Sequence, residues 1–232
     1  MKKLKVVSVV LVCLVALVLM SCEDNINTEL FTFNSATGAI TRYNGPGGHV
    51  TIPASIDGRP VTAIGSRAFF DRGLTGVTIP SSVTSIRSEA FARNRLTGVI
   101  IPNSVTSIGG MAFLYNHLTS VVIPDSVTSI GLYAFAGNRL SSVTISNSII
   151  SIPQSAFEYN RLASVIIPQS VTNIEWSAFF NNVLTSITIG ANVTLGNFSF
   201  PAGFVDTYNN GGRLAGTYTR PDTTSWAWTR RL

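Results

Sequence analysis

Few residues of this chain could carry out catalysis or bind a metal. Among its 232 residues only His49 and His117 are histidines, the side chains best suited to proton transfer near neutral pH or to metal ligation. A catalytic triad or a metal site would need both beside carboxylates. Glu158 and Glu175 could form the carboxylate pair of a glycosidase, although such a spacing is accidental in most sequences. With no glycine-rich phosphate loop before a helix, the sequence predicts no catalytic residue, no metal and no cofactor.

The elements that would position these side chains are copies of one 22-residue repeat. The copies begin at Leu74, Leu96, Leu118, Leu140 and Leu162, and a degenerate sixth copy begins at Leu184. A fixed period of this length, with Leu, Val and Ile at constant offsets, is typical of a leucine-rich-repeat solenoid in which each copy is one coil. His49 and His117 would then lie about three coils apart, on the order of 14 Å along the stack, and would not share a site.

The copy at residues 96–117 illustrates the expected local structure. Residues 96–101 are rich in β-branched side chains and predict a strand, which Pro102 ends because proline has no N–H. Residues 105–108 predict a second extended piece. Ala112 and Phe113 predict a short helical or 3₁₀ turn that places the ring in the centre of the coil.

Two residue types recur at every period and indicate what holds the coils together. Phenylalanine follows alanine at Phe69, Phe91, Phe113, Phe135, Phe157 and Phe179. Asparagine precedes each new strand at Asn94, Asn116, Asn138, Asn160 and Asn182. A stacked asparagine is expected to bond the backbone of its own bend and of the neighbouring coil. One coil alone buries too little apolar surface to offset the entropy of ordering it, so the coils must stack.

The predicted fold is an α/β repeat, mostly β. It is a leucine-rich-repeat solenoid of 22-residue coils, with a parallel sheet on one face and a cap at each end. An alternating pattern around a glycine turn places an N-terminal cap hairpin in residues 31–49. The repeats occupy residues 50–203, and a C-terminal cap occupies residues 204–232, where the repeat pattern is lost.

The first residues of the chain predict export. Residues 1–21 have three lysines, an apolar run and then Cys22, in an arrangement that resembles a lipoprotein signal peptide with its lipobox. An ordinary signal peptide cut near Ser21 is the alternative. If Cys22 is lipidated, the acidic residues 22–30 form a tether, and the protein is lipid-anchored to the bacterial envelope.

Removal of that segment leaves a nearly neutral chain. All lysines lie within it, so thirteen arginines face eleven acidic residues and the formal charge falls from +5 to +2. This balance does not support a nucleic-acid partner. Only Cys22 remains as a thiol, which excludes an intrachain disulfide.

A basic column is the first candidate partner-binding surface. The residue after successive asparagines is Arg95, His117, Arg139 and Arg161. Stacked about 5 Å apart, these cations would repel one another and attract an anionic partner. The alternative interpretation is a solvated edge without a ligand.

Two further sets of side chains are candidates. Ile100, Val122 and Ile166 fall on the outward face of the predicted strands, where they could form a binding strip or a self-association face, or reflect β-propensity alone. Tyr115, Tyr159 and Trp176 fall near the Ala-Phe turn, where amphipathic rings suit an interface but could equally shield the convex side.

The repeat at residues 118–135 resembles those of the BspA-like, treponemal-type leucine-rich repeat proteins, and the resemblance covers nearly the whole chain after Cys22. It implies a surface-exposed, non-catalytic binding protein, adhesin-like, whose partner is a host matrix protein or another bacterial surface protein. The alternative is a structural or self-assembling envelope lipoprotein. A hydrolase is a third hypothesis with little support in the residues.

Overall fold

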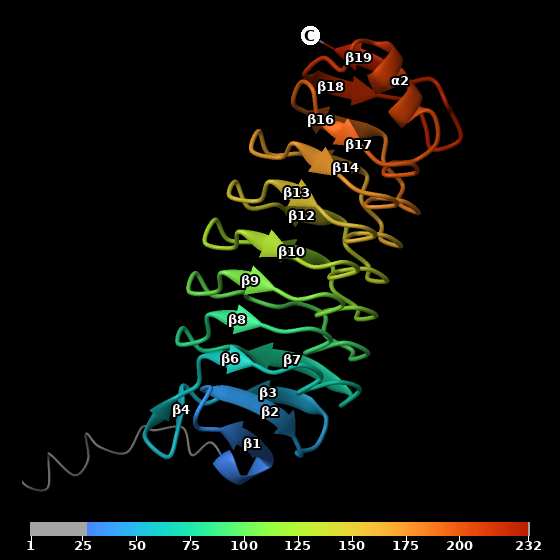
Figure 1. Ribbon diagram of the computed structural model, residues 1–232. Coiled ribbons are helices and arrows are strands. Elements are labelled where there is room, and N and C mark those ends of the chain that lie inside the picture. The colour runs from blue at the N-terminus through green and yellow to red at the C-terminus, as the bar shows by residue number, and fades with distance from the viewer. Residues whose placement is uncertain (1–26, 232) are drawn as a thin grey trace, which may run out of the picture.

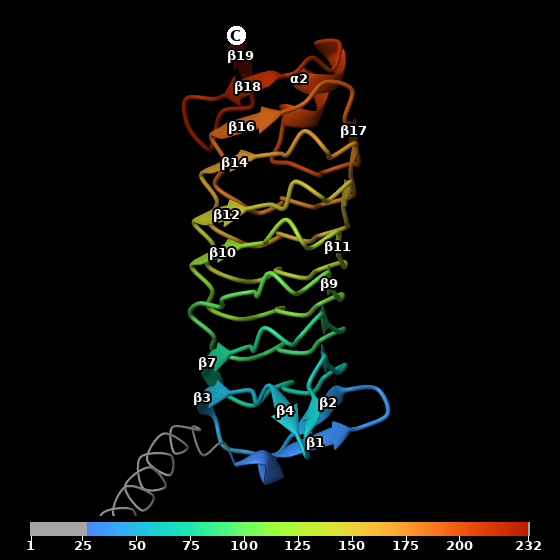
Figure 2. The same ribbon diagram turned by 90° about the vertical axis from the view of Figure 1, so that its left-hand side faces the viewer.

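The computed structural model describes residues 27–231. In this range the chain winds into a solenoid whose successive turns stack along one axis (Figure 1). Two rows of short strands run along it, on opposite sides of the coils (Figure 2). The first row comprises β3 (Gly48–Thr51), β7 (Leu74–Thr78), β10 (Ser120–Val122), β12 (Ser142–Thr144), β14 (Ser164–Ile166) and β16 (Ser186–Ile189). The second comprises β6 (Ala63–Ile64), β8 (Ser85–Ile86), β9 (Ser107–Ile108), β11 (Ser129–Ile130), β13 (Ser151–Ile152), β15 (Asn173–Ile174) and β17 (Thr194–Leu195).

Most neighbouring strands within each row pair in parallel, one repeat apart, although in the described residues β12 does not pair with β14, nor β11 with β13. In the first row Ser120 pairs with Ser142, and in the second Ser107 pairs with Ser129. The predicted mostly-β solenoid of 22-residue coils is therefore confirmed. The second extended piece of each repeat is also a ladder strand, so parallel sheets lie on two faces of the coil rather than one.

The first row is interrupted where a strand was predicted. Residues 96–101 form no strand: β7 pairs with β3, and β10 pairs with β12. Within residues 27–231, no backbone hydrogen bond joins residues 98–101 to a neighbouring coil. The prediction for this copy was wrong. Gly98 weakens a strand because it has no side chain to pack on the sheet, but the equivalent Gly76 lies within β7, so the glycine alone does not explain the interruption.

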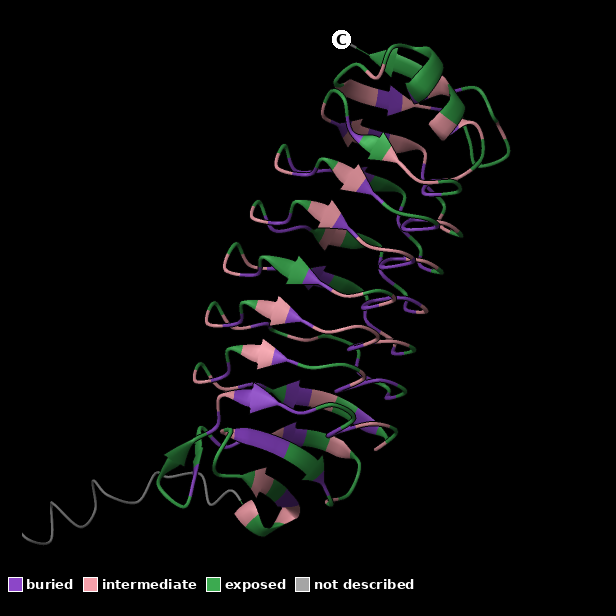
Figure 3. Cartoon of the chain, in the orientation of Figure 1, coloured by how far each residue is buried: buried purple, intermediate pink, exposed green. Residues whose placement is uncertain are grey.

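The core is a stack of phenylalanine rings along the solenoid axis. Neighbouring rings from Phe69 to Phe200 are stacked with centroids 5.0–5.6 Å apart. Leu, Val and Ile from both strand rows bury against these rings. Buried segments recur in every coil (Figure 3). The repeat length therefore sets one ring per coil, and each ring shields the next from water.

At the Ala-Phe bend, alternate backbone N–H groups donate hydrogen bonds within the bend and to the next coil. The N–H groups of Ala112 and Leu114 close local turns, whereas those of Met111, Phe113 and Tyr115 donate to the next coil. Met111 and Tyr115 have positive φ, 59° and 52°. The expected short helical turn is thus replaced by hydrogen-bonded turns, because half of the amides point along the stack.

The N-terminal end is closed by an antiparallel hairpin of β1 (Phe31–Asn34) and β2 (Ala39–Tyr43), as the fold prediction expected. Tyr43 extends the ring stack, with its centroid 5.2 Å from that of Phe69. A 3₁₀ helix η1 (Thr28–Leu30) precedes the hairpin, and Leu30 packs partly against the core. An insertion in the first coil forms a small hairpin of β4 (Ser55–Ile56) and β5 (Arg59–Pro60).

The C-terminal end is closed by α2 (Phe204–Asn210), β18 (Gly216–Thr219) and β19 (Thr229–Arg231). Phe204 meets Phe200 edge-on, with centroids 4.7 Å apart, which ends the parallel ring stack. β18 pairs antiparallel with β16, and the exposed β19 completes the sheet (Figure 3). Trp228 is buried in this cap, whereas Trp226 is exposed.

Candidate functional site

The basic column lies just before the first strand row. Arg95, Arg139 and Arg161 are exposed and His117 is half-buried. The backbone N–H groups of Arg95, His117, Arg139 and Arg161 donate to the carbonyls of Leu74, Leu96, Leu118 and Leu140, respectively. Each cation therefore occupies the same position in successive coils, and the structure aligns these predicted residues in one column.

The charge of this column is uncompensated. Coils here are spaced about 5.5 Å apart, as the phenylalanine rings show. In the described residues the only ion pair joins Arg67 to Glu89, 3.6 Å apart, in a different part of the repeat. Exposed charges at the column spacing repel by about 1 kcal/mol or less in water, which a bound anionic group would relieve.

An apolar strip follows the outward face of the first strand row. Ile100, Val122 and Ile166 expose 84%, 62% and 70% of their surface. The neighbouring strands place Thr78 and Thr144 at the equivalent positions. Val122 lies in β10 and Ile166 in β14, whereas Ile100 lies in the unpaired segment between β7 and β10. Single exposed apolar residues are ordinary, but three at equivalent positions of the coils form a larger apolar surface.

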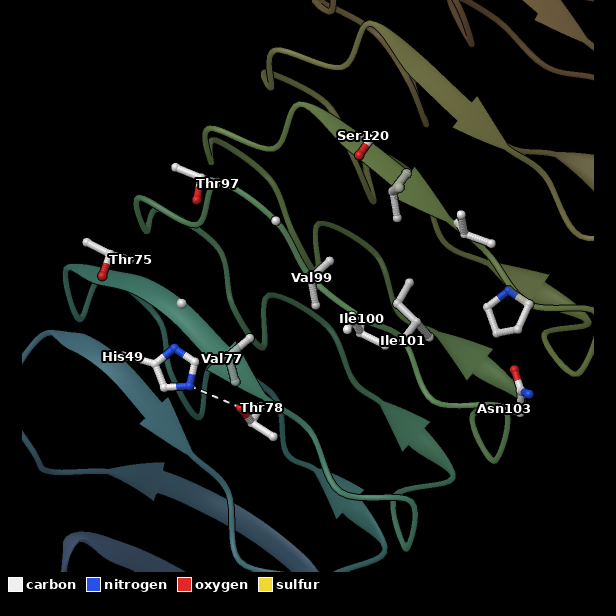
Figure 4. A pocket seen from close by; sticks show the side chains of 15 residues that line it. His49, Thr75, Val77, Thr78, Thr97, Val99, Ile100, Ile101, Asn103 and Ser120 are labelled. Carbon is white, nitrogen blue, oxygen red and sulfur yellow. Dashed lines mark hydrogen bonds between the residues drawn. The ribbon is translucent and has the colours of Figure 1, made fainter.

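A depression of about 810 Å³ opens at the N-terminal part of this strip (Figure 4). His49 stands beside it, and its Nε2 atom lies 3.0 Å from the Thr78 hydroxyl. Gly98 leaves the space open, whereas the His49 ring lies against Gly76. The same strand position holds serine in the later coils at Ser120, Ser142, Ser164 and Ser186. The sequence analysis named Ile100 and Val122 as candidates but did not predict the depression, for which the change from glycine to serine along one column was the available signal.

Nothing in residues 27–231 groups three histidine, cysteine or acidic side chains as a metal site would require. His49 is engaged with Thr78, and a carboxylate oxygen of Glu175 accepts a hydrogen bond from the Gln154 N–H.

Comparisons with known proteins identify the scaffold. A family model described as a BspA-type leucine-rich repeat region matches six copies, across residues 49–136 and 84–202. The chain belongs to the BspA-type leucine-rich repeat family. A comparison with curated protein sequences finds no match.

Solved structures agree with this BspA-type assignment. A leucine-rich repeat protein of T. pallidum is 27% identical, with a TM-score of 0.62, and the match covers 79% of this chain and 94% of that one. The pneumococcal vaccine antigen PcpA is 24% identical, with a TM-score of 0.57 and coverage of 66% and 45%. A leucine-rich repeat protein of Bacteroides ovatus is 20% identical, with a TM-score of 0.52 and coverage of 72% and 54%. The last two show the fold alone.

The aromatic candidates of this BspA-type chain lie on the bends. Tyr115 and Tyr159 are exposed and precede His117 and Arg161 by two residues, so they border the basic column. The ring of Tyr115 lies over Gly137, the equivalent residue of the next coil. Trp176 is also exposed, but it follows β15 and belongs to the second strand row. The structure thus brings the two tyrosines, but not Trp176, near the cations.

The predicted signal peptide, residues 1–21, and the lipidation site Cys22 lie outside the described residues. In the part of the chain that is described, no helix has the length and apolar character needed to cross a membrane.

Proposed function

We propose that this chain is a non-catalytic, surface-displayed binding protein, adhesin-like, that recognises an acidic surface of a protein partner through the basic column. Proteins with BspA-type repeats are typically surface-exposed or secreted, and leucine-rich repeats commonly present protein-binding surfaces. The observation that carries the proposal is the alignment of Arg95, Arg139 and Arg161, exposed in one column without an ion pair in residues 27–231. Host matrix proteins and other bacterial surface proteins are the partners to test first.

Electrostatic recognition of this kind depends on salt. Because exposed charges are screened within about 8–10 Å at physiological ionic strength, binding through the column should weaken as salt is raised. The test is biolayer interferometry of the protein against a panel of matrix proteins at several salt concentrations. Changing Arg95, Arg139 and Arg161 together to serine should lower affinity at least ten-fold and flatten the salt dependence.

A matched control removes the same charge elsewhere. Arg42, Arg59 and Arg87 are exposed and lie outside the column. Their joint replacement by serine should leave binding within about two-fold, since only the local field of the column is proposed to matter. Equal losses in both triple variants would reduce the effect to net charge and remove the column from the mechanism.

Lipid anchoring at Cys22 is the proposed route to the envelope. Its support is the lysine-rich start, the apolar run and the cysteine that follows. Growth with a labelled fatty acid should label the native chain and leave Cys22→Ser unlabelled. Label in both, or in neither, would contradict a lipidated Cys22.

The second candidate function is self-assembly in the envelope. The exposed strip of Ile100, Val122 and Ile166 favours it, because two such uncharged strand faces could pack against each other. Sedimentation velocity at high concentration checks this candidate, and a strictly monomeric profile argues against it.

A further inference from the structure

We infer that the depression beside His49 receives an aliphatic side chain from an extended, acidic segment of the protein partner. This inference rests on the proposed function, since it places a second contact next to the basic column. The depression would select the side chain of the partner, and the basic column would attract its acidic residues.

The lining of the depression determines the chemistry of the group it accepts. Its floor is open at Gly98, where an added Cβ would meet no atom within 4 Å. Val99, half-buried beside that glycine, and the exposed Ile100 and Val122 supply apolar surface, and no lining residue carries a fixed charge. A branched aliphatic group of the partner would bury apolar surface at about 25 cal/mol per Å².

Unused backbone groups favour a polypeptide as the occupant. Within the described residues, the N–H and C=O groups of residues 98–101 make no backbone hydrogen bond, although the equivalent residues of β10 pair with β12. An extended peptide carries main-chain donors and acceptors along its length and can satisfy such groups directly or through water. A lipid tail has no such groups.

The basic column determines the charge that the rest of the partner's segment must carry. Arg95 lies two residues before Thr97, which lines the depression, and His117 and Arg139 follow in the next coils. Arg95 precedes Ile100 by five residues, and five residues of extended chain span about 16 Å. A bound segment that runs parallel to residues 95–100 would therefore carry its acidic residue four or five positions from its aliphatic residue. A motif with this spacing would engage both features.

The test uses a fluorescent ten-residue peptide with one leucine and two glutamates, the nearer four positions away. Variant peptides carry Leu→Ser or both Glu→Gln, and fluorescence anisotropy gives the affinities for the full exported chain. We expect the leucine peptide to bind at least ten-fold more tightly than the serine peptide. Equal affinities, or no binding of the leucine peptide at millimolar concentration, would overturn the inference.

Protein variants locate the contact. Gly98→Val fills the depression at a position with open space, and Ser164→Val introduces the same side chain in the same column, in the second strand after β10. Gly98→Val should weaken the leucine peptide at least ten-fold, and Ser164→Val should leave it unchanged. Ile100→Ser, at an exposed site, should also weaken it, and equal peptide affinities of all three proteins would contradict the inference.

The two proposals fail differently. Loss of binding in the column triple variant with no effect of Gly98→Val supports the column and removes the depression. The reverse result supports the depression and removes the column. If Gly98→Val instead dissolves a dimer in sedimentation velocity, a second copy of the chain is the occupant and the acidic-segment inference is wrong.

Discussion

The side-chain amide of Asn138 donates a hydrogen bond of 3.0 Å to the backbone carbonyl of Phe113 in the preceding coil. The same NH₂ group donates to the carbonyl of Phe135 in its own bend, and the Oδ1 atom accepts from the Leu118 N–H. One buried side chain thus satisfies backbone groups of two coils. The asparagine column repeats this pattern along the stack and secures bends that would otherwise bury unpaired polar groups.

Asn138→Ala should destabilise the solenoid by about 3 kcal/mol, because it leaves at least two buried backbone groups without partners. Urea unfolding followed by circular dichroism measures the change. Asn182 makes the same contacts but is half-buried, so Asn182→Ala should cost less. If both variants cost the same, burial does not determine the contribution of the column.

Ser199→Ala should stabilise the protein by about 1–2 kcal/mol. Ser199 occupies the position held by alanine in the other coils, and its buried hydroxyl has no hydrogen-bond partner in residues 27–231. Its removal eliminates the cost of burying an unpaired polar group. Ser146 is a matched control, because its buried hydroxyl donates to the carbonyl of Val127 at 2.7 Å. Ser146→Ala should therefore destabilise, and thermal unfolding that shifts in the same direction for both would contradict this explanation.

Gly137→Ala should destabilise by at least about 1 kcal/mol. Gly137 has φ of 65°, and a Cβ there would collide with the ring of Tyr115. A left-handed conformation alone costs an alanine about 1–2 kcal/mol. Gly98→Ala is the control, since Gly98 has open space and no positive φ, and it should be neutral or slightly stabilising. Denaturant midpoints that fall equally for both variants would exclude this cause.

The contact between Asp125 and Asn147 should make stability depend on pH. Hydrogen bonds from the Asn147 backbone and side chain lower the pKa of Asp125 below its ordinary value of 3.8. The unfolded chain therefore binds more protons in the window below that value, so the contribution is present above about pH 4 and is lost as the pH falls through the lowered pKa. Asn147→Ala should reduce stability at pH 6, and the difference from the unmodified chain should shrink toward pH 2. A constant difference across this range would show that Asp125 is not the titrating group.

Part of the site was predictable and part was not. The alignment of Arg95 with Arg139 follows from the repeat period, because residues at equal offsets must stack once the coils do. His49 and Gly98 line one depression from different coils, and the first coil contains an insertion, so the position of His49 depends on how β3 meets β7. Trp226 and Trp228 illustrate the same limit: they alternate in the sequence, yet only Trp228 is buried against Phe204.

The sequence by itself determined the solenoid, its coil length and its core. Phe113 and Asn138 recur at one spacing, and only stacking can bury the ring and satisfy the amide in every copy. The tertiary structure decided where ladders form and where they break, as at residues 96–101, because strand pairing depends on the twist and side chains of both neighbouring coils. It also determined the position and lining of the depression, because the residues that line it come from several coils and no single repeat contains them all.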